Sequence, residues 1–163
     1  SQHTVKGFEM LKKATNIDGN VIIAALLHHE RLDGSGYPKK LKQKDIPFLV
    51  QIVSVADTFD AICSERSFQS KKSVFAAIYE LMKESNSNKL NPAIVVPFVK
   101  YIMRQYIREE VRLSNGETAE IVFIHENEPH QPLVRVGEEY MDLRRVRRVE
   151  IVDHVNHKMV KAP

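Results

Sequence analysis

The side chains best suited to chemistry lie in one short stretch, in which His28-His29-Glu30 precedes a glycine-rich turn. The stretch follows seven apolar residues, 21–27, which by themselves predict a buried helix. A lone histidine on such a helix is most often a hydrogen-bonded core residue, but two adjacent ones favour metal ligation. Neighbouring helical residues point about 100° apart. We therefore expect His28 and His29 to address two nearby points, an arrangement that suits two metal ions about 3.5 to 4 Å apart.

A carboxylate, Asp57, interrupts the most hydrophobic helix that the sequence predicts. We expect it to be buried, and a buried carboxylate costs several kcal/mol unless it is paired, hydrogen-bonded or bound to a metal. One interpretation is a metal ligand. The alternative is that Asp57 accepts hydrogen bonds from a neighbouring helix end or from Arg66. Asp60 follows one turn later, as a second ligand, a partner of a ligand or an exposed residue.

The turn after the histidines has the composition of an anion site. Gly34 and Gly36 allow positive φ at two positions, which would let consecutive backbone N–H groups point at a phosphate. Tyr37 and Pro38 add an aromatic face, a hydroxyl and a stiff exit. Arg66 carries a guanidinium suited to bidentate phosphate binding. In isolation the turn reads as an ordinary surface loop, but beside two histidines it is a candidate phosphate rim.

These side chains must be positioned by helices, because apolar residues recur at helical spacing through about the first 108 residues. We expect one helix around residues 5–11 and others over about 18–30, 47–64, 73–85 and 92–106. The predicted helix over 47–64 is apolar on nearly every side, and we expect it to be central and buried.

After about residue 108 the pattern changes to short alternating segments, and Asn115-Gly116 is a strong hairpin signal. Expected strands lie near 111–113, 119–124, 133–136, 141–146 and 149–152. The fold class is therefore α+β, with an all-helical domain over 1–108 and a small antiparallel β module with a C-terminal tail over 109–163.

Two features of the β module have ordinary and functional interpretations. Its histidines, which we expect at the surface and for which a metal site is the alternative, are His125, His130, His154 and His157. The arginine run over 144–148 is interpreted as a charged strand edge that blocks further pairing, and alternatively as a binder of phosphate or nucleic acid.

Composition favours an ordinary folded globular protein. The chain has 163 residues, 43% hydrophobic and 28% charged, which is typical of a folded globular protein. Cys63 is the only cysteine, so an intramolecular disulfide is excluded and a reducing, cytoplasmic compartment is expected. Apolar runs of seven residues are too short to span a bilayer. A net charge of +3 is too small to imply nucleic-acid binding.

The ordered motifs together resemble the HD-GYP family, a branch of the HD metal-dependent phosphohydrolases. The resemblance covers about residues 3–105 and rests on His28-His29-Glu30, the turn over 33–38, Ile46-Pro47, the segment 57–61 and Arg66. It implies an HD-like helical domain with a di- or trinuclear divalent metal centre, often iron or manganese, that hydrolyses cyclic di-GMP. The metal ligands that it implies are His3, His28, His29 and Asp57. It also implies nucleotide contacts at Gly36, Tyr37, Pro38 and Arg66, and a catalytic role near the centre for Asp60.

The sequence departs from that family in two respects. Gln69 stands three residues after Arg66, where the family often has a basic residue, and this argues against strong phosphate binding. In addition, no His-Asp dipeptide occurs in the sequence. The family carries such a pair upstream of the position of His3. We therefore expect this chain to be the C-terminal portion of a longer phosphodiesterase, to hold metal incompletely and to show little or no turnover alone. Apolar surface left exposed would favour a homodimer. The alternatives are a degenerate nucleotide-binding or protein-interaction module, and a phosphohydrolase acting on another phosphate ester.

Overall fold

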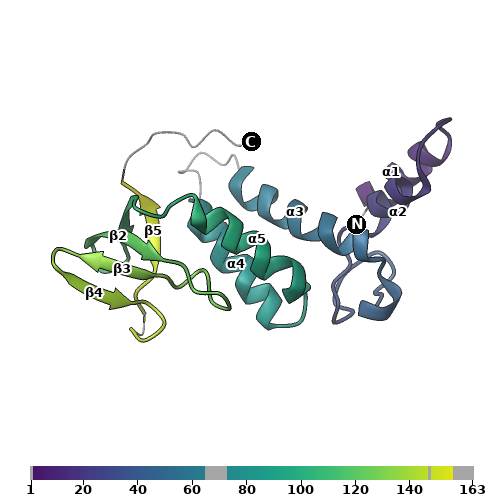
Figure 1. The fold of residues 1–163 in the computed structure, drawn as a ribbon. Coiled ribbons are helices and arrows are strands. Elements are labelled where there is room, and N and C mark those ends of the chain that lie inside the picture. The colour runs from purple at the N-terminus through teal and green to yellow at the C-terminus, as the bar shows by residue number, and fades with distance from the viewer. Residues whose placement is uncertain (1, 65–72, 147, 156–163) are drawn as a thin grey trace. The chain divides into compact units, whose positions relative to one another are not determined.

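The computed structural model describes residues 2–64, 73–146 and 148–155, which form helices followed by a sheet (Figure 1). The chain forms two compact units. The first comprises Ser1–Ser64 and Glu80–Val95, and the second comprises Glu65–Tyr79 and Val96–Pro163. The predicted α+β class is confirmed, and the domain boundary at 108/109 stays a prediction.

Three helices and one turn of 3₁₀-helix build most of the first unit. They are α1 (Gln2–Lys12), α2 (Gly19–Leu27), η1 (Gln43–Asp45) and α3 (Phe48–Ser64). Helix α1 packs against α2, and α2 packs against α3. The apolar residues at their centre are Ala24, Leu26, Leu27, Ile46 and Val50. Burying these side chains fixes the end of α2, where the paired histidines follow.

Helix α2 begins at the start of its predicted range and ends earlier than predicted. The Asp18 side chain accepts a hydrogen bond from the Asn20 N–H at 2.7 Å, which satisfies one of the free donors of the first turn. The last helical residue is Leu27, and His28 is the C-cap. The predicted continuation to about Glu30 is therefore wrong, and His29 lies outside the helix.

Helix α3 is not the fully buried helix that its composition predicts. Its buried residues are Val50, Gln51, Ser54 and Val55, which lie on one face of its first half. Phe48 is 60% exposed, Leu49 45% and Ile52 40%. The prediction from apolar composition thus overestimated the burial of α3. Among the described residues, the helices of this unit cover only one side of it.

Two further helices, α4 (Val74–Asn86) and α5 (Pro92–Arg104), agree with their predicted ranges to within two residues. Asn91 caps α5, since its side-chain oxygen accepts a hydrogen bond from the Ala93 N–H at 2.9 Å. Proline at the first helical position costs no backbone bond, because that N–H has no intrahelical partner.

The second unit contains a five-stranded antiparallel sheet in the order β4-β3-β2-β1-β5 (Figure 1). Its strands are β1 (Glu110–Leu113), β2 (Thr118–Phe123), β3 (Leu133–Val136), β4 (Glu139–Asp142) and β5 (Ile151–His154). The predicted turn at Asn115-Gly116 joins β1 and β2, with Gly116 at φ +91°. The predicted antiparallel β module is confirmed.

Strand β4 occupies a different segment from the one predicted, because a second glycine turn was overlooked. Gly137 lies at φ +59° and closes a two-residue turn, so Val136 pairs with Glu139 and β4 starts there. The strand ends at Asp142, whose carboxylate accepts a hydrogen bond from the Arg144 N–H at 3.1 Å. Arginines 144, 145 and 148 therefore lie in the connection after β4, and the strand-edge interpretation is wrong; Arg147 lies outside the described residues.

The module histidines are also less exposed than predicted. The side chain of His125 is 13% exposed and lies 3.2 Å from an Asp142 oxygen. His154 is 14% exposed and lies 3.1 Å from Glu109 Oε2. His130 contacts the Tyr79 ring edge-on at 5.7 Å, and burial lowers its pKa. His157 lies outside the described residues. The described imidazoles thus contact residues of the sheet unit and are not surface side chains.

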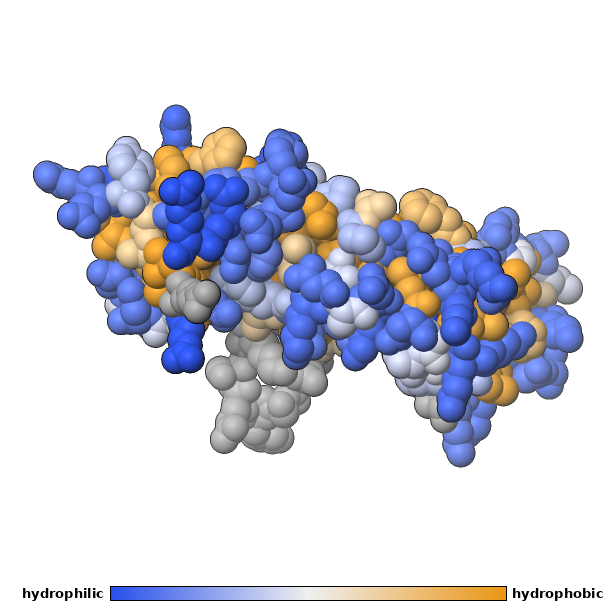
Figure 2. All heavy atoms as spheres, turned by 90° about the horizontal axis from the view of Figure 1, so that it is seen from below, coloured by the Kyte–Doolittle hydropathy of each residue, from blue (hydrophilic) through white to orange (hydrophobic). Residues whose placement is uncertain are grey.

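Apolar side chains reach the surface in several places. Figure 2 shows hydrophobic residues among hydrophilic ones on one face of the molecule. In the first unit the large exposed ones include Val5, Met10, Val21 and the three on α3. Over the described ranges, no helix is both long and apolar enough to cross a membrane.

Candidate metal centre

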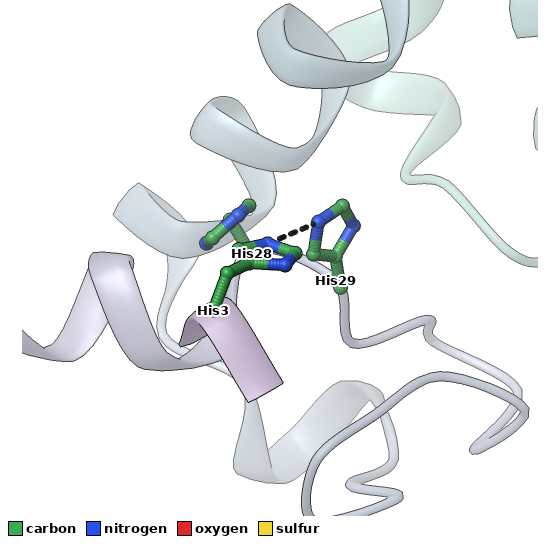
Figure 3. A group of neighbouring side chains, drawn as sticks. All are labelled: His3, His28 and His29. Carbon is green, nitrogen blue, oxygen red and sulfur yellow. Dashed lines mark hydrogen bonds between the residues drawn. The ribbon is translucent and has the colours of Figure 1, made fainter. Parts of the chain in front are cut away.

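Three imidazoles converge in the first unit, as Figure 3 shows. His3 comes from the first turn of α1, and His28 and His29 directly follow the last residue of α2. Their ring centroids are 4.3 Å apart for His28 and His29, 4.9 Å for His3 and His29, and 5.6 Å for His3 and His28. One nitrogen from each ring lies within 4.8 Å of the other two. Residues 26 positions apart in sequence thus present three nitrogen donors to one point.

The early end of α2 explains how two adjacent histidines meet. The 100° separation applies to consecutive residues of a helix. His28 is the last position with helical backbone angles, and His29 lies past it, so its side chain is free to turn toward its neighbour. The donor atoms of the three rings lie within 4.8 Å of one another, and the expectation of two nearby metal positions stays a prediction.

The His28 ring is held in one orientation by the helix itself. Its Nδ1 lies 3.1 Å from the Ala24 carbonyl oxygen, one turn earlier. A carbonyl only accepts, so Nδ1 carries the proton and Nε2 keeps its lone pair. Backbone or carboxylate acceptors fix metal-binding histidines in this way, which leaves the second nitrogen available to the ion.

His29 is the most strongly perturbed group of the centre. Burial, with smaller contributions from His28, His3 and Arg31, lowers its pKa from 6.5 to about 4, against the opposing effect of Asp57. The ring is therefore neutral at pH 7. Its Nε2 lies 3.0 Å from His3 Nε2, so one of the two nitrogens donates to the other. A neutral imidazole is the form that binds a metal ion.

The predicted carboxylate ligand lies beside the three imidazoles. Asp57 Oδ2 is 3.7 Å from His29 Nδ1, which is longer than a hydrogen bond. Its side chain is 37% exposed, so the expectation of a buried carboxylate is wrong. Asp60 is exposed and accepts a hydrogen bond from Ser64 Oγ at 3.2 Å. Arg66 lies outside the described residues.

The glycine-rich turn does not form the predicted backbone cradle. Gly34 has positive φ, but Gly36 does not. The N–H groups are used within the turn, since Gly34 donates to the Arg31 carbonyl, Ser35 to the Asp33 carboxylate and Tyr37 to the His29 carbonyl. These three N–H groups are therefore not available to a phosphate, and the contact predicted at Gly36 stays a prediction.

Gly36 and Tyr37 serve the centre in another way. A Cβ on Gly36 would lie 2.3 to 2.5 Å from backbone atoms of residues 29–31, so only glycine allows the turn to pass this close to His29. The Tyr37 ring then stacks on His29 at 4.7 Å. Tyr37 and Pro38 also line an open hollow of about 470 Å³, together with Gln2, Val5 and Lys6.

The sequence did not assign a role to the two residues that hold this turn in place. Glu30 is 2% exposed, and its carboxylate accepts hydrogen bonds from the Lys39 N–H at 2.6 Å and the Leu41 N–H at 2.8 Å. Arg31 donates to the carbonyls of His28 and Glu30. The only signal for either was its place next to the paired histidines.

This donor set fits a divalent metal ion. Imidazole nitrogens suit zinc, iron, copper and nickel, and three protein ligands with open positions are typical of catalytic sites. Two nitrogens bound at about 2.1 Å and at right angles to each other would lie about 3 Å apart, close to the 3.0 Å between the Nε2 atoms of His3 and His29.

Comparison with known proteins places this centre in a family. A family model described as HD domain matches residues 1–94, which include the three histidines and Asp57. The chain belongs to the HD domain family. Its motifs and its relatives place it in the HD-GYP branch.

Three curated relatives of this HD domain protein are informative. A cyclic di-GMP phosphodiesterase of Thermotoga maritima is 42% identical over 104 residues, which cover 61% of this chain and 27% of that protein. A cyclic di-GMP phosphodiesterase of Pseudomonas aeruginosa is 32% identical over 135 residues, covering 83% of this chain and 32% of the relative. A 3'3'-cGAMP-specific phosphodiesterase of Vibrio cholerae is 49% identical over 45 residues, covering 28% and 9%. The chain thus spans a third or less of the length of these relatives.

Proposed function

We propose that this chain is part of a metal-dependent phosphodiesterase that hydrolyses cyclic di-GMP. The observation that carries the proposal is the convergence of His3, His28 and His29 beside Asp57 in a chain of the HD domain family. The matched relatives named as cyclic di-GMP phosphodiesterases support the substrate. We also propose that the complete centre holds two or three ions, with iron or manganese as the metal.

The residues of the chain would divide the work as follows. His3, His28 and His29 hold a divalent ion, and Asp57 either binds it or orients His29. A bound ion supplies the means to activate water for attack on phosphorus and to offset charge on the phosphoryl oxygens. Tyr37 and Pro38 line the adjacent hollow, where the nucleotide would lie. Arg66 is proposed to bind phosphate, and Asp60 to assist near the centre.

Several side chains prepare the centre for this role before substrate binds. The backbone carbonyl of Ala24 orients the His28 ring through Nδ1, and burial keeps the His29 ring neutral. Tyr37 covers one face of His29 and limits the access of water to it. Ligands that need neither deprotonation nor reorientation bind a metal ion at a lower cost in free energy.

The proposal is tested by metal content and by hydrolysis. Metal bound to the 163-residue chain is measured after dialysis against manganese or iron, for the wild type and for His28→Ala and Asp57→Ala. We expect His28→Ala to remove most of the metal and Asp57→Ala to weaken its binding. Unchanged metal content in both variants would contradict the ligand assignment.

Hydrolysis is measured with the protein that contains this chain, using cyclic di-GMP, linear dinucleotides and mononucleotide esters. We expect turnover of the cyclic dinucleotide that depends on metal and on His28. Metal binding without any turnover would favour the degenerate, nucleotide-binding alternative. The same assay on the chain by itself tests the expectation that it has little activity alone.

A second substrate is favoured by one comparison, the 49% identity over 45 residues to a 3'3'-cGAMP-specific phosphodiesterase. Both molecules are cyclic dinucleotides joined by phosphodiester bonds, so the same centre would serve either. Parallel assays with cyclic di-GMP and 3'3'-cGAMP distinguish them by their kcat/KM values.

A further inference from the structure

The Arg31 side chain joins three elements of the first unit and touches none of the three imidazole rings that form the centre. It follows directly on His28-His29-Glu30, and it is 16% exposed. Its Nη1 donates to the Glu30 carbonyl at 3.1 Å and to the His28 carbonyl at 3.4 Å. These carbonyls lie at or beyond the end of α2, where no further helical turn supplies donors. Arg31 Nη1 thus holds the backbone carbonyls on either side of His29.

The second terminal nitrogen of Arg31 reaches the helix that carries Asp57. Nη2 donates to Thr58 Oγ1 at 3.2 Å, and Thr58 Oγ1 in turn donates to the Ser54 carbonyl at 2.8 Å. The hydroxyl is therefore fixed in α3 and offers its lone pair to Arg31. Because Thr58 adjoins Asp57, this bond sets the position of α3 relative to the histidines.

The third nitrogen anchors the guanidinium itself. Arg31 Nε lies 3.3 Å from Glu84 Oε2 on α4, and the Glu84 side chain is 20% exposed. Removing one member of a partly buried ion pair is costly, because it leaves the other charge without compensation. Only the planar guanidinium fork presents three nitrogens in fixed directions, and a lysine ammonium cannot make these three hydrogen bonds and the ion pair with Glu84 at once.

We propose that Arg31 is a positioning residue for the metal centre. It holds the backbone of His28 and His29 at the distance from Asp57 at which one ion can contact both the imidazoles and the carboxylate. This inference rests on the proposed function for the identity of the centre. Arg31 acts through the backbone and Thr58, and it is not itself a ligand. Its loss changes the geometry of the donors and not their number.

The test compares Arg31→Lys, which keeps the charge beside Glu84, with the wild-type chain. Affinity for manganese is measured by competition with a chelator, and the free energy of unfolding of the metal-free chain is measured with urea. We expect Arg31→Lys to weaken manganese binding about 10- to 100-fold while the metal-free chain stays folded. Arg135→Lys, which alters the pair with Glu120 in the sheet unit, is the matched control and should bind manganese as the wild type does.

A purely structural role would lower the free energy of unfolding and leave the manganese affinity of the folded chain unchanged, and that result overturns the proposal. If Arg31→Lys does not fold, Thr58→Val provides the test, because it removes only the hydroxyl that accepts from Arg31 and donates to the Ser54 carbonyl. A several-fold loss of affinity then supports the proposal, and an unchanged affinity overturns it. Failure of the phosphodiesterase proposal looks different: manganese binding responds to Arg31→Lys, but the longer protein that contains this chain hydrolyses no cyclic dinucleotide.

Discussion

At the scale of single residues, the centre depends on which nitrogen of each ring is free. His28 Nδ1 is bonded to Ala24, and the pKa of His29 is lowered to about 4, chiefly by burial. The His28 ring is therefore oriented by a backbone contact, and the His29 ring is neutral at pH 7. The residue types and the pairing of His28 with His29 could be read from the sequence. Their tautomers could not, because these depend on acceptors that only the fold brings near.

The lowered pKa of His29 predicts how folding stability depends on pH. Between about pH 4 and 6.5 the unfolded chain binds a proton at His29 that the folded chain does not bind. Stability from this group is thus fully present above pH 6.5 and is lost as the pH falls toward 4. Urea unfolding of the metal-free chain at pH 7 and pH 5 measures the effect. His29→Gln should show a smaller loss over this interval, and an equal loss in both proteins would contradict the assignment.

Asp57 is predicted to act on metal binding more than on folding. It is 37% exposed, so Asp57→Asn leaves no buried charge unpaired and should change the free energy of unfolding by less than about 1 kcal/mol. Manganese affinity should fall about 10- to 100-fold, because the carboxylate beside His29 is lost. Asp45→Asn, a substitution of an exposed carboxylate in the same unit, is the control. Equal effects of the two substitutions on manganese affinity would exclude a role for Asp57.

At the scale of elements, the sequence predicted the helices well and the burial of their faces less well. Helical periodicity and the cap at Asn91 place α4 and α5 within two residues of their ends. The exposure of Phe48, Leu49 and Ile52 was missed, because burial depends on what covers a helix and composition does not report this. Gly137 was missed for a related reason. A glycine-glutamate turn is a weaker hairpin signal than Asn115-Gly116.

The close passage of the glycine-rich turn predicts a sharp difference between two glycines. Gly36→Ala would place a Cβ within 2.5 Å of backbone atoms that cannot move without shifting His29. We expect a loss of about 1–3 kcal/mol in the free energy of unfolding. Gly7→Ala meets nothing within 4 Å and lies within α1, so it should add about 0.5–1 kcal/mol. Urea denaturation of both variants checks the pair, and a neutral Gly36→Ala would contradict the packing described.

At the scale of the whole molecule, the chain combines a helical HD domain with a sheet unit of its own core. The family resemblance and the α+β class could be predicted from ordered motifs and from the change of periodicity near residue 108. The association state could not, although the exposed side chains of Phe48, Leu49 and Ile52 bear on it.

A homodimer remains our prediction for the chain in solution. Sedimentation velocity should show a dimer for the wild type and a shift toward monomer for Ile52→Glu, because a charge on this face opposes apolar association. Met10→Glu changes an apolar residue on α1 that is 74% exposed, against 40% for Ile52, and serves as the control. A wild-type chain that sediments as a monomer at all concentrations would contradict the prediction.

The central claim is that His3, His28 and His29 bind one divalent ion. Its most direct test is a crystal structure of the chain grown with manganese, with anomalous diffraction recorded at the manganese absorption edge. We predict an anomalous peak between the three imidazoles, bonded to a nitrogen of each and adjacent to Asp57. A peak elsewhere, or three imidazoles that hold no ion at saturating manganese, would contradict the account.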